Sequence, residues 1–86
     1  MKLPKEQLIP GRWYYAHIYK SDYYIQFERF EDNGDTIITM DYYYEGKLNG
    51  YRSSWGYYKD IDTLEVATEL PNGEKLVPEI NSYQIY

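Results

Sequence analysis

Apolar and polar residues alternate along much of this chain, which is the pattern of β-strands that bury one face of a sheet. The alternating segments are 13–19, 23–28, 39–44 and 63–70, and they are rich in the tyrosine, isoleucine and threonine that strands favour. Residues 4–8 are compatible with one short helical turn, and no other segment has helical periodicity. The pattern therefore predicts an all-β protein of five or six strands.

Three Asn-Gly dipeptides divide the strands, and each predicts an antiparallel hairpin. They are Asn33-Gly34, Asn49-Gly50 and Asn72-Gly73. Type I′ hairpin turns need positive φ at both central residues, which Asn and Gly tolerate best. Pro71 favours a longer loop at the third dipeptide, with Gly73 in the left-handed conformation. Strands joined by hairpins form a meander, and so short and twisted a sheet is expected to curl into an SH3-like or OB-like barrel or half-barrel.

The hydrophobic pattern also selects the register of each hairpin. Centring the first hairpin on Asn33-Gly34 puts apolar residues opposite each other, whereas a one-residue slip would set Ile25 against Asp41. The selected register predicts the pairs Tyr23–Tyr44, Ile25–Tyr42 and Phe27–Met40 on the apolar face, and Tyr24–Tyr43, Gln26–Asp41 and Glu28–Thr39 on the other. The later hairpins are predicted to pair Tyr42 with Tyr57, Tyr43 with Gly56, Tyr44 with Trp55, Thr68 with Leu76, and Glu69 with Lys75. The expected buried residues are Ile18, Ile25, Phe27, Ile38, Met40, Tyr42, Trp55 and Val66.

An 86-residue chain can bury one small core, so residues 1–86 are interpreted as a single β domain that opens with the segment 1–10. Residues 1–20 carry four basic and one acidic side chain, whereas residues 21–86 carry five basic and thirteen acidic ones. Because an acidic surface repels a phosphate backbone, nucleic-acid binding is not expected. The segment 1–10 does not resemble a signal peptide, and no stretch of about 18 apolar residues occurs. We therefore expect a cytoplasmic location and no membrane partner.

Residues that could support catalysis or metal binding are few. His17 is the only histidine and there is no cysteine, so no metal cluster built on these ligands is expected. A catalytic triad would need Ser53 or Ser54 to reach His17. Residues 32–35 resemble a fragment of a calcium loop, but their spacing lacks the twelve-residue pattern, so a turn is the better interpretation. The chain is therefore predicted not to be an enzyme and to use no cofactor.

Thirteen tyrosines are the main outlier in the composition. Tyrosine is favoured both in strands and at binding surfaces, so these residues could form core or contact surface. In the first strand, Tyr14, Ala16 and Ile18 make up the more apolar face, which leaves the neighbouring positions on the other face. The predicted binding residues are Trp13, Tyr15, Tyr19, Tyr24 and Tyr43 with the carboxylates Glu28 and Asp41, and His17 and Tyr58 are expected on the same side.

Two functional classes fit these features. The first is a protein-binding module whose aromatic face, framed by carboxylates, binds a partner with a basic surface. Small acidic inhibitors that phages and mobile elements direct against host defence proteins share this size and composition. The alternative is a binder of a small ligand or carbohydrate, with tyrosine and tryptophan rings stacked in the mouth of a barrel. A flat aromatic and acidic surface would favour the first class and a concave aromatic pocket the second, and neither specifies an oligomeric state.

Overall fold

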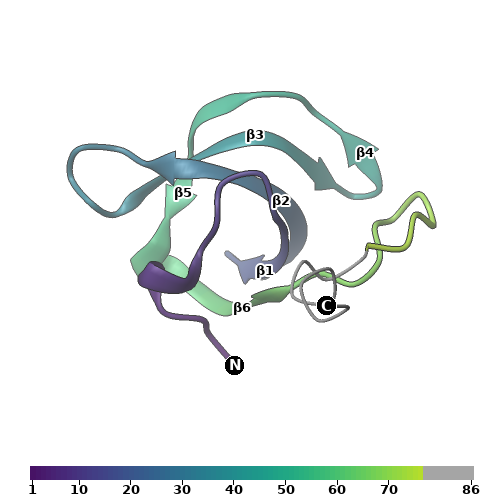
Figure 1. The fold of residues 1–86 in the computed structure, drawn as a ribbon, viewed down its shortest axis with the longest axis horizontal. Coiled ribbons are helices and arrows are strands. Elements are labelled where there is room, and N and C mark those ends of the chain that lie inside the picture. Colours follow the sequence, from purple (N-terminus) through teal and green to yellow (C-terminus); the bar gives the residue numbers. More distant parts are fainter. Residues whose placement is uncertain (77–86) are drawn as a thin grey trace, which may run out of the picture.

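The computed structural model describes residues 1–76 (Figure 1). Its strands are β1 (Trp13–Ile18), β2 (Ser21–Phe30), β3 (Thr36–Tyr44), β4 (Lys47–Leu48), β5 (Arg52–Tyr57) and β6 (Ile61–Val66). Two single-turn 3₁₀ helices, η1 (Lys5–Gln7) and η2 (Tyr58–Asp60), precede β1 and β6. In the described part of the chain, no helix is long and apolar enough to cross a membrane.

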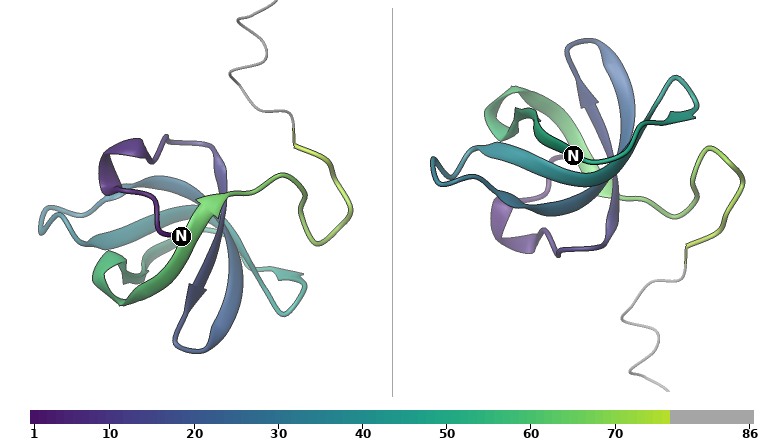
Figure 2. Two further views of the ribbon diagram at one scale, coloured as in Figure 1. Left: turned by 90° about the horizontal axis from the view of Figure 1, so that it is seen from below. Right: turned by 90° about the horizontal axis from the view of Figure 1, so that it is seen from above.

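The strands form one antiparallel sheet in the order β4-β3-β2-β1-β6, and β5 also pairs with β3. β3 pairs with β2 along one edge, while β5 and β4 follow each other along its other edge. The sheet curls around a common interior, and no pairing joins β5 to β6 within residues 1–76 (Figure 1 and Figure 2). The predicted all-β fold with a half-barrel shape is therefore confirmed, whereas the predicted meander holds for β1 to β4 only, because β6 pairs with β1. Strands joined by hairpins lie side by side, unlike the Greek key of an OB fold.

The hairpin of β2 and β3 has the predicted register over most of its length. The predicted pairs Tyr23–Tyr44, Tyr24–Tyr43, Ile25–Tyr42 and Gln26–Asp41 are confirmed. The pairs Phe27–Met40 and Glu28–Thr39 are wrong, because two compensating irregularities on either side of Phe27 place it opposite Thr39. Phe27 is also bonded on its other edge: its N–H donates to Arg12 O (3.1 Å), and its carbonyl accepts from the Gly11 N–H (2.8 Å). A shift of one residue exchanges the two faces of a strand, so Thr39 is completely buried and Met40 is 40% exposed.

The second hairpin turn is not at Asn49-Gly50. β3 turns into β4 at Glu45-Gly46, where φ is 51° and 79°, as a two-residue type I′ turn requires. Asn49-Gly50 instead forms the bend between β4 and β5, where its backbone bonds to β3. The predicted pairs Tyr42–Tyr57, Tyr43–Gly56 and Tyr44–Trp55 are therefore wrong, since β5 pairs with the first half of β3 and sets Gly56 opposite Ile37.

The remaining turns follow the prediction more closely. Asn33-Gly34 lies in a four-residue loop closed by the hydrogen bond from Glu31 N–H to Thr36 O (2.8 Å). The third hairpin pairs Glu69 with Lys75 as predicted, and Gly73 has a φ of 92°. The gap between the alternating segments 13–19 and 23–28 predicts a turn at residues 20–22. In the structure this turn is one residue earlier, because Tyr19 and Lys20 adopt positive φ. Pro78 lacks a backbone donor and therefore predicts an edge strand or a strand break, but it lies outside the described residues.

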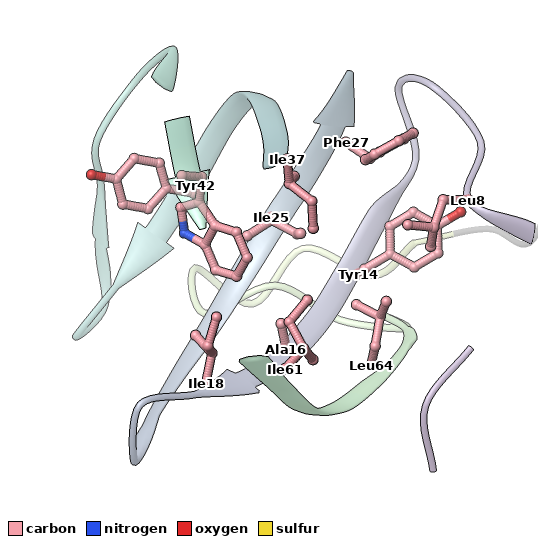
Figure 3. Packing of buried hydrophobic residues seen from close by; sticks show 11 residues of the cluster. Leu8, Tyr14, Ala16, Ile18, Ile25, Phe27, Ile37, Tyr42, Ile61 and Leu64 are labelled. Carbon is pink, nitrogen blue, oxygen red and sulfur yellow. The ribbon is translucent and has the colours of Figure 1, made fainter. Parts of the chain in front are cut away.

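The core lies inside the curl of the sheet. Figure 3 shows side chains of β1, β2, β3 and β6 converging there, with Leu8 from the N-terminal segment covering one end. Six predicted core residues are buried, namely Ile18, Ile25, Phe27, Ile38, Tyr42 and Trp55. Met40 and Val66 were predicted wrongly: Met40 is displaced by the irregularity in β3, and Val66, 41% exposed, ends β6 at the margin of the sheet.

Two tyrosines tie the N-terminal segment to this core. Tyr14 is completely buried, and its hydroxyl accepts the Ile9 N–H (2.8 Å) and donates to Gln7 O (3.4 Å). Tyr58 packs against the core cluster and donates its hydroxyl hydrogen to Leu3 O. Tyr58 therefore belongs to the core side, and the expectation that it would join the outer aromatic face is wrong.

Candidate functional site

The outer face of the sheet carries a row of side chains that crosses five strands. Tyr15 on β1 lies opposite Tyr24 on β2 and Glu65 on β6, Tyr24 lies opposite Tyr43 on β3, and Tyr43 lies opposite Leu48 on β4. Residues that oppose each other across antiparallel strands project from the same face. These five residues are called the outer row below. The row exists because β1 alternates strictly, with Tyr14, Ala16 and Ile18 buried and the residues between them turned outward.

The aromatic rings of this face contact one another. The rings of Tyr15 and Tyr24 lie 5.6 Å apart between centroids, and Trp13 contacts Tyr43 at the same distance. Tilted pairs at such separations are favourable arrangements of aromatic rings. Tyr43 is buried in the middle of the face, whereas Trp13, Tyr15 and Tyr24 are partly exposed around it. These contacts form two pairs, and the pairing of Tyr24 with Tyr43 across β2 and β3 places the two pairs side by side, so four of the five predicted aromatic residues share one face.

Tyr19, the fifth, is separate from this surface. It lies in the turn between β1 and β2 with a φ of 52°, and its hydroxyl donates to Asp60 Oδ2 (2.6 Å). Among residues 1–76 its ring makes none of the aromatic contacts that join the other four. This hydrogen bond is the main reason that the pKa of Tyr19 rises to about 12.

A matching hydrogen bond fixes Tyr15 in the outer row. Its hydroxyl donates to Asp22 Oδ1 at 2.6 Å. This bond, with smaller contributions from burial and from nearby negative charge, raises the pKa of Tyr15 to about 12. Tyr15 is therefore a neutral hydrogen-bond donor at physiological pH. Its partner Asp22 is one carboxylate that the sequence analysis did not assign to this face.

A groove of about 400 Å³ lies beside the rings of Tyr15 and Tyr24. The segment that continues from β6 forms its other side, and the residues around it are Tyr15, Tyr24, Glu65, Val66, Ala67, Thr68 and Glu69. Two carboxylates and no basic side chain line this groove. At its rim, Glu69 Oε1 accepts a charged hydrogen bond from Lys75 Nζ at 2.9 Å. The groove is therefore aromatic on one side and acidic on the other.

The two predicted carboxylates have structural contacts. Asp41 Oδ1 accepts the N–H of Gly50 (2.7 Å) and that of Tyr42 (2.9 Å), so it holds the bend between β4 and β5 against β3. Glu28 lies at the irregularity of β2 and pairs with Arg29 (3.7 Å). The acids closest to the aromatic face are instead Asp22, Glu65 and Glu69. Glu65 could have been assigned to the aromatic face only if the pairing of β6 with β1 had been known. The sequence contains no turn signal that predicts this long-range pairing.

Tyr23, Tyr44 and Trp55 form a second group of aromatic rings that pack against one another. Tyr23 stacks on Tyr44 with centroids 5.0 Å apart and meets the edge of Trp55 at 5.3 Å. Trp55 is only 9% exposed, so its ring serves as core. A second groove, of about 430 Å³, lies by Arg29, Ile38 and Tyr51 and has a single aromatic residue in its lining.

His17 is paired with a carboxylate and not with a serine in the described structure. His17 Nδ1 lies 3.1 Å from Asp62 Oδ2, and the described structure contains no hydrogen bond from His17 to Ser53 or Ser54. Within residues 1–76, no group of three or more potential ligands could hold a metal ion. In the loop 32–35, Asn33 Oδ1 accepts the N–H groups of Asp35 and Thr36, as an Asx turn does.

Comparisons with known proteins give no match: no protein-family model matches the chain, no curated protein matches its sequence, and no solved structure matches its fold. The function is therefore argued from the geometry alone.

Proposed function

We propose that this protein is a non-catalytic binding module that holds a protein partner on the outer face of its sheet. The observation that carries the proposal is the outer row, in which three tyrosines and a leucine lie side by side across four strands and end at Glu65. Tyrosine and tryptophan dominate the energetically important parts of protein interfaces. A continuous aromatic surface on a single-layer sheet is suited to that role.

Charge supports a partner with a basic surface. Asp22, Glu65 and Glu69 surround the rings of Tyr15 and Tyr24, and the chain has a formal net charge of −5. Two lysines near the N-terminus have contacts at another place: Lys5 donates to Gly34 O (2.6 Å) and lies 3.5 Å from Asp35, and Lys2 Nζ lies 4.3 Å from the ring centroid of Tyr58. Carboxylates around an aromatic centre accelerate the approach of a basic partner and exclude acidic ones. Nucleic acid is a poor partner for the same reason.

A narrower form of this function is inhibition of a host defence protein, as small acidic proteins of phages and mobile elements do. The support for it is the small size and the acidic composition of the chain. In this form the outer face would occupy a basic surface that the target uses for its own substrate, and the protein would act in the cytoplasm.

The experiment compares partner capture by matched tyrosine variants. The chain would serve as bait in a lysate of its native host, next to Tyr15→Ala with Tyr24→Ala in one variant and Tyr51→Ala as control. Tyr51 is 62% exposed and lies on the other groove, so its loss alters composition in the same way at a different place. We expect the control to retain the captured protein and the double variant to lose it while remaining folded by circular dichroism.

Hydrogen exchange on the purified complex would then locate the contact surface. Protection is expected along β1 and β2, where Tyr15 and Tyr24 lie. Retention of the partner by the double variant, or protection confined to the region of Tyr51, would refute the proposal. A partner displaced by the loss of Tyr51 alone would refute it as well.

A further inference from the structure

We propose that the groove beside Tyr15 and Tyr24 receives an arginine side chain of the protein partner, with the guanidinium against the rings and paired to Glu65. This inference deepens the proposed function and rests on it, because it names the chemical group by which the partner is anchored. It follows from the shape of the groove, from its charge and from the carboxylate of Glu65, which pairs with no residue of the described part of the chain.

The walls of the groove match the two parts of an arginine side chain. The Tyr15 and Tyr24 rings lie 5.6 Å apart at an angle of 59°, and together they form the aromatic wall. A guanidinium is planar and weakly hydrated, so it stacks on such rings readily. Val66 and Ala67 supply an aliphatic wall for the methylene stem. The volume of about 400 Å³ is enough for one long side chain.

The negative charge of the groove favours the binding of one cation. Glu69 is already paired with Lys75, which shows that an ammonium group can sit at this rim. Glu65 is partly buried beside Tyr15, and within residues 1–76 its carboxylate has neither an ion pair nor a hydrogen bond. A partly buried, unpaired carboxylate gains most from a charged donor that arrives with a partner. Asp22 adds to the effect, because it accepts the hydroxyl hydrogen of Tyr15 and makes that ring more electron-rich.

Arginine fits these features better than lysine. Its fork of N–H donors can bind both oxygens of Glu65 while its flat face remains on the rings, whereas an ammonium is a strongly hydrated point charge. Lys75 acts as a competing cation of the chain itself at the rim of the same groove. Removing it should therefore strengthen the binding of an external guanidinium.

The test is a titration of the whole, isotope-labelled chain with N-acetylarginine amide, followed by the backbone amide resonances in NMR spectra. The neutral isostere N-acetylcitrulline amide and N-acetyllysine amide serve as comparison ligands. We expect saturable shifts centred on Tyr15, Tyr24 and Glu65 with a millimolar dissociation constant, as for other ligands of this size. Citrulline should produce no saturation, and lysine should bind more weakly than arginine.

Variants assign the effect to the groove. Glu65→Gln keeps the shape and removes the charge, so it should weaken arginine binding by about fivefold or more. Glu74→Gln removes an exposed charge outside the groove and should change binding by less than about twofold. Lys75→Met should tighten binding. The melting temperature of each variant would show that the fold is intact.

The outcomes separate this inference from the proposed function. Equal binding of citrulline, an unchanged constant in Glu65→Gln, or shifts located away from Tyr15 and Tyr24 would overturn the arginine site. If those results coincided with loss of partner capture in the tyrosine double variant, the binding face would stand without the arginine anchor. If arginine bound as expected while the double variant still captured its partner, the proposed function would fail instead.

Discussion

Replacing Asp41 by alanine distinguishes a structural carboxylate from a partner-binding one. The sequence pattern assigned Asp41 to the binding face, next to Gln26. In the structure, its Oδ1 accepts the Gly50 N–H at 2.7 Å and the Tyr42 N–H at 2.9 Å. We therefore expect Asp41→Ala to destabilise the fold through the bend between β4 and β5.

The magnitude follows from the hydrogen bond that is lost. A hydrogen bond to a charged group contributes about 1.5–3 kcal/mol, and a buried donor left without an acceptor costs a similar amount. The Gly50 N–H is partly buried, so we expect a loss of about 2 kcal/mol in the free energy of unfolding. For a domain of this size the melting temperature would fall by roughly 10 °C. Asp41→Asn keeps an oxygen acceptor without the charge and should lose about half as much.

The assay is urea denaturation followed by tryptophan fluorescence, which reports on Trp13 on the outer face and on Trp55 in the core. The control is Glu74→Ala, which removes an exposed carboxylate and should change stability by less than about 0.5 kcal/mol. If Asp41→Ala matched this control in stability and yet lost the partner, Asp41 would be a binding residue. The structural role argued here would then be wrong.

Three further outcomes are expected from single substitutions. Phe27→Ala should cost about 3–5 kcal/mol in urea denaturation because the ring is buried, whereas Met40→Ala should cost less than about 1 kcal/mol; similar losses would contradict the observed register. Lys20→Gly should raise the free energy of unfolding by about 0.5–1 kcal/mol, since it relieves a φ of 64°, and a lower free energy of unfolding would argue against that turn. Because the pKa of Tyr15 is raised to about 12, the folded state retains its proton and loses stability as the pH rises from about 10 to 12. The difference in tyrosinate absorbance between the wild-type chain and Tyr15→Phe isolates the ionisation of Tyr15. In Asp22→Asn this ionisation should move to lower pH. If it did not move, the hydrogen bond to Asp22 would not be the cause of the raised pKa.

The accuracy of the sequence prediction depended on local contrast between the two faces of a strand. β1 alternates between Tyr14, Ala16 and Ile18 on one side and more polar or larger residues on the other, and its faces were assigned correctly. Residues 37–40 of β3 are Ile, Ile, Thr and Met, a run in which either face is acceptable. The irregularities beside Phe27 could therefore shift β3 by one residue without exposing several large apolar side chains to solvent. Binary pattern alone cannot detect such a shift, because both registers leave one isoleucine and one less hydrophobic residue on each face of this run.

The turn between β3 and β4 was missed because two adjacent signals competed. Asn49-Gly50 is the stronger type I′ dipeptide, but Glu45-Gly46 comes first and closes a two-residue turn at once. The chain then uses Asn49 and Gly50 for the bend, where the Asn49 N–H donates to Tyr42 O (2.8 Å). A longer hairpin centred on Asn49-Gly50 would pair β5 with the end of β3, so the observed pairing of β5 with the start of β3 would be lost. Long-range pairing therefore decided between turns that have similar local propensity.

The sequence did not show which tyrosines belong to the core and which to the surface. In the structure, the hydrogen-bond partner of the hydroxyl group distinguishes the two sets. The hydroxyls of Tyr14 and Tyr58 bond to backbone groups of the N-terminal segment, so these rings can lie in or against the core without an unsatisfied polar atom. The hydroxyls of Tyr15 and Tyr19 bond to the carboxylates of Asp22, which is exposed, and Asp60, which is half-buried. The first arrangement closes the half-barrel, and the second holds rings in place on its outside. Because a surface ring that is already ordered loses less conformational entropy when a partner binds, the hydrogen bond from Tyr15 to Asp22 favours the outer face as the binding surface.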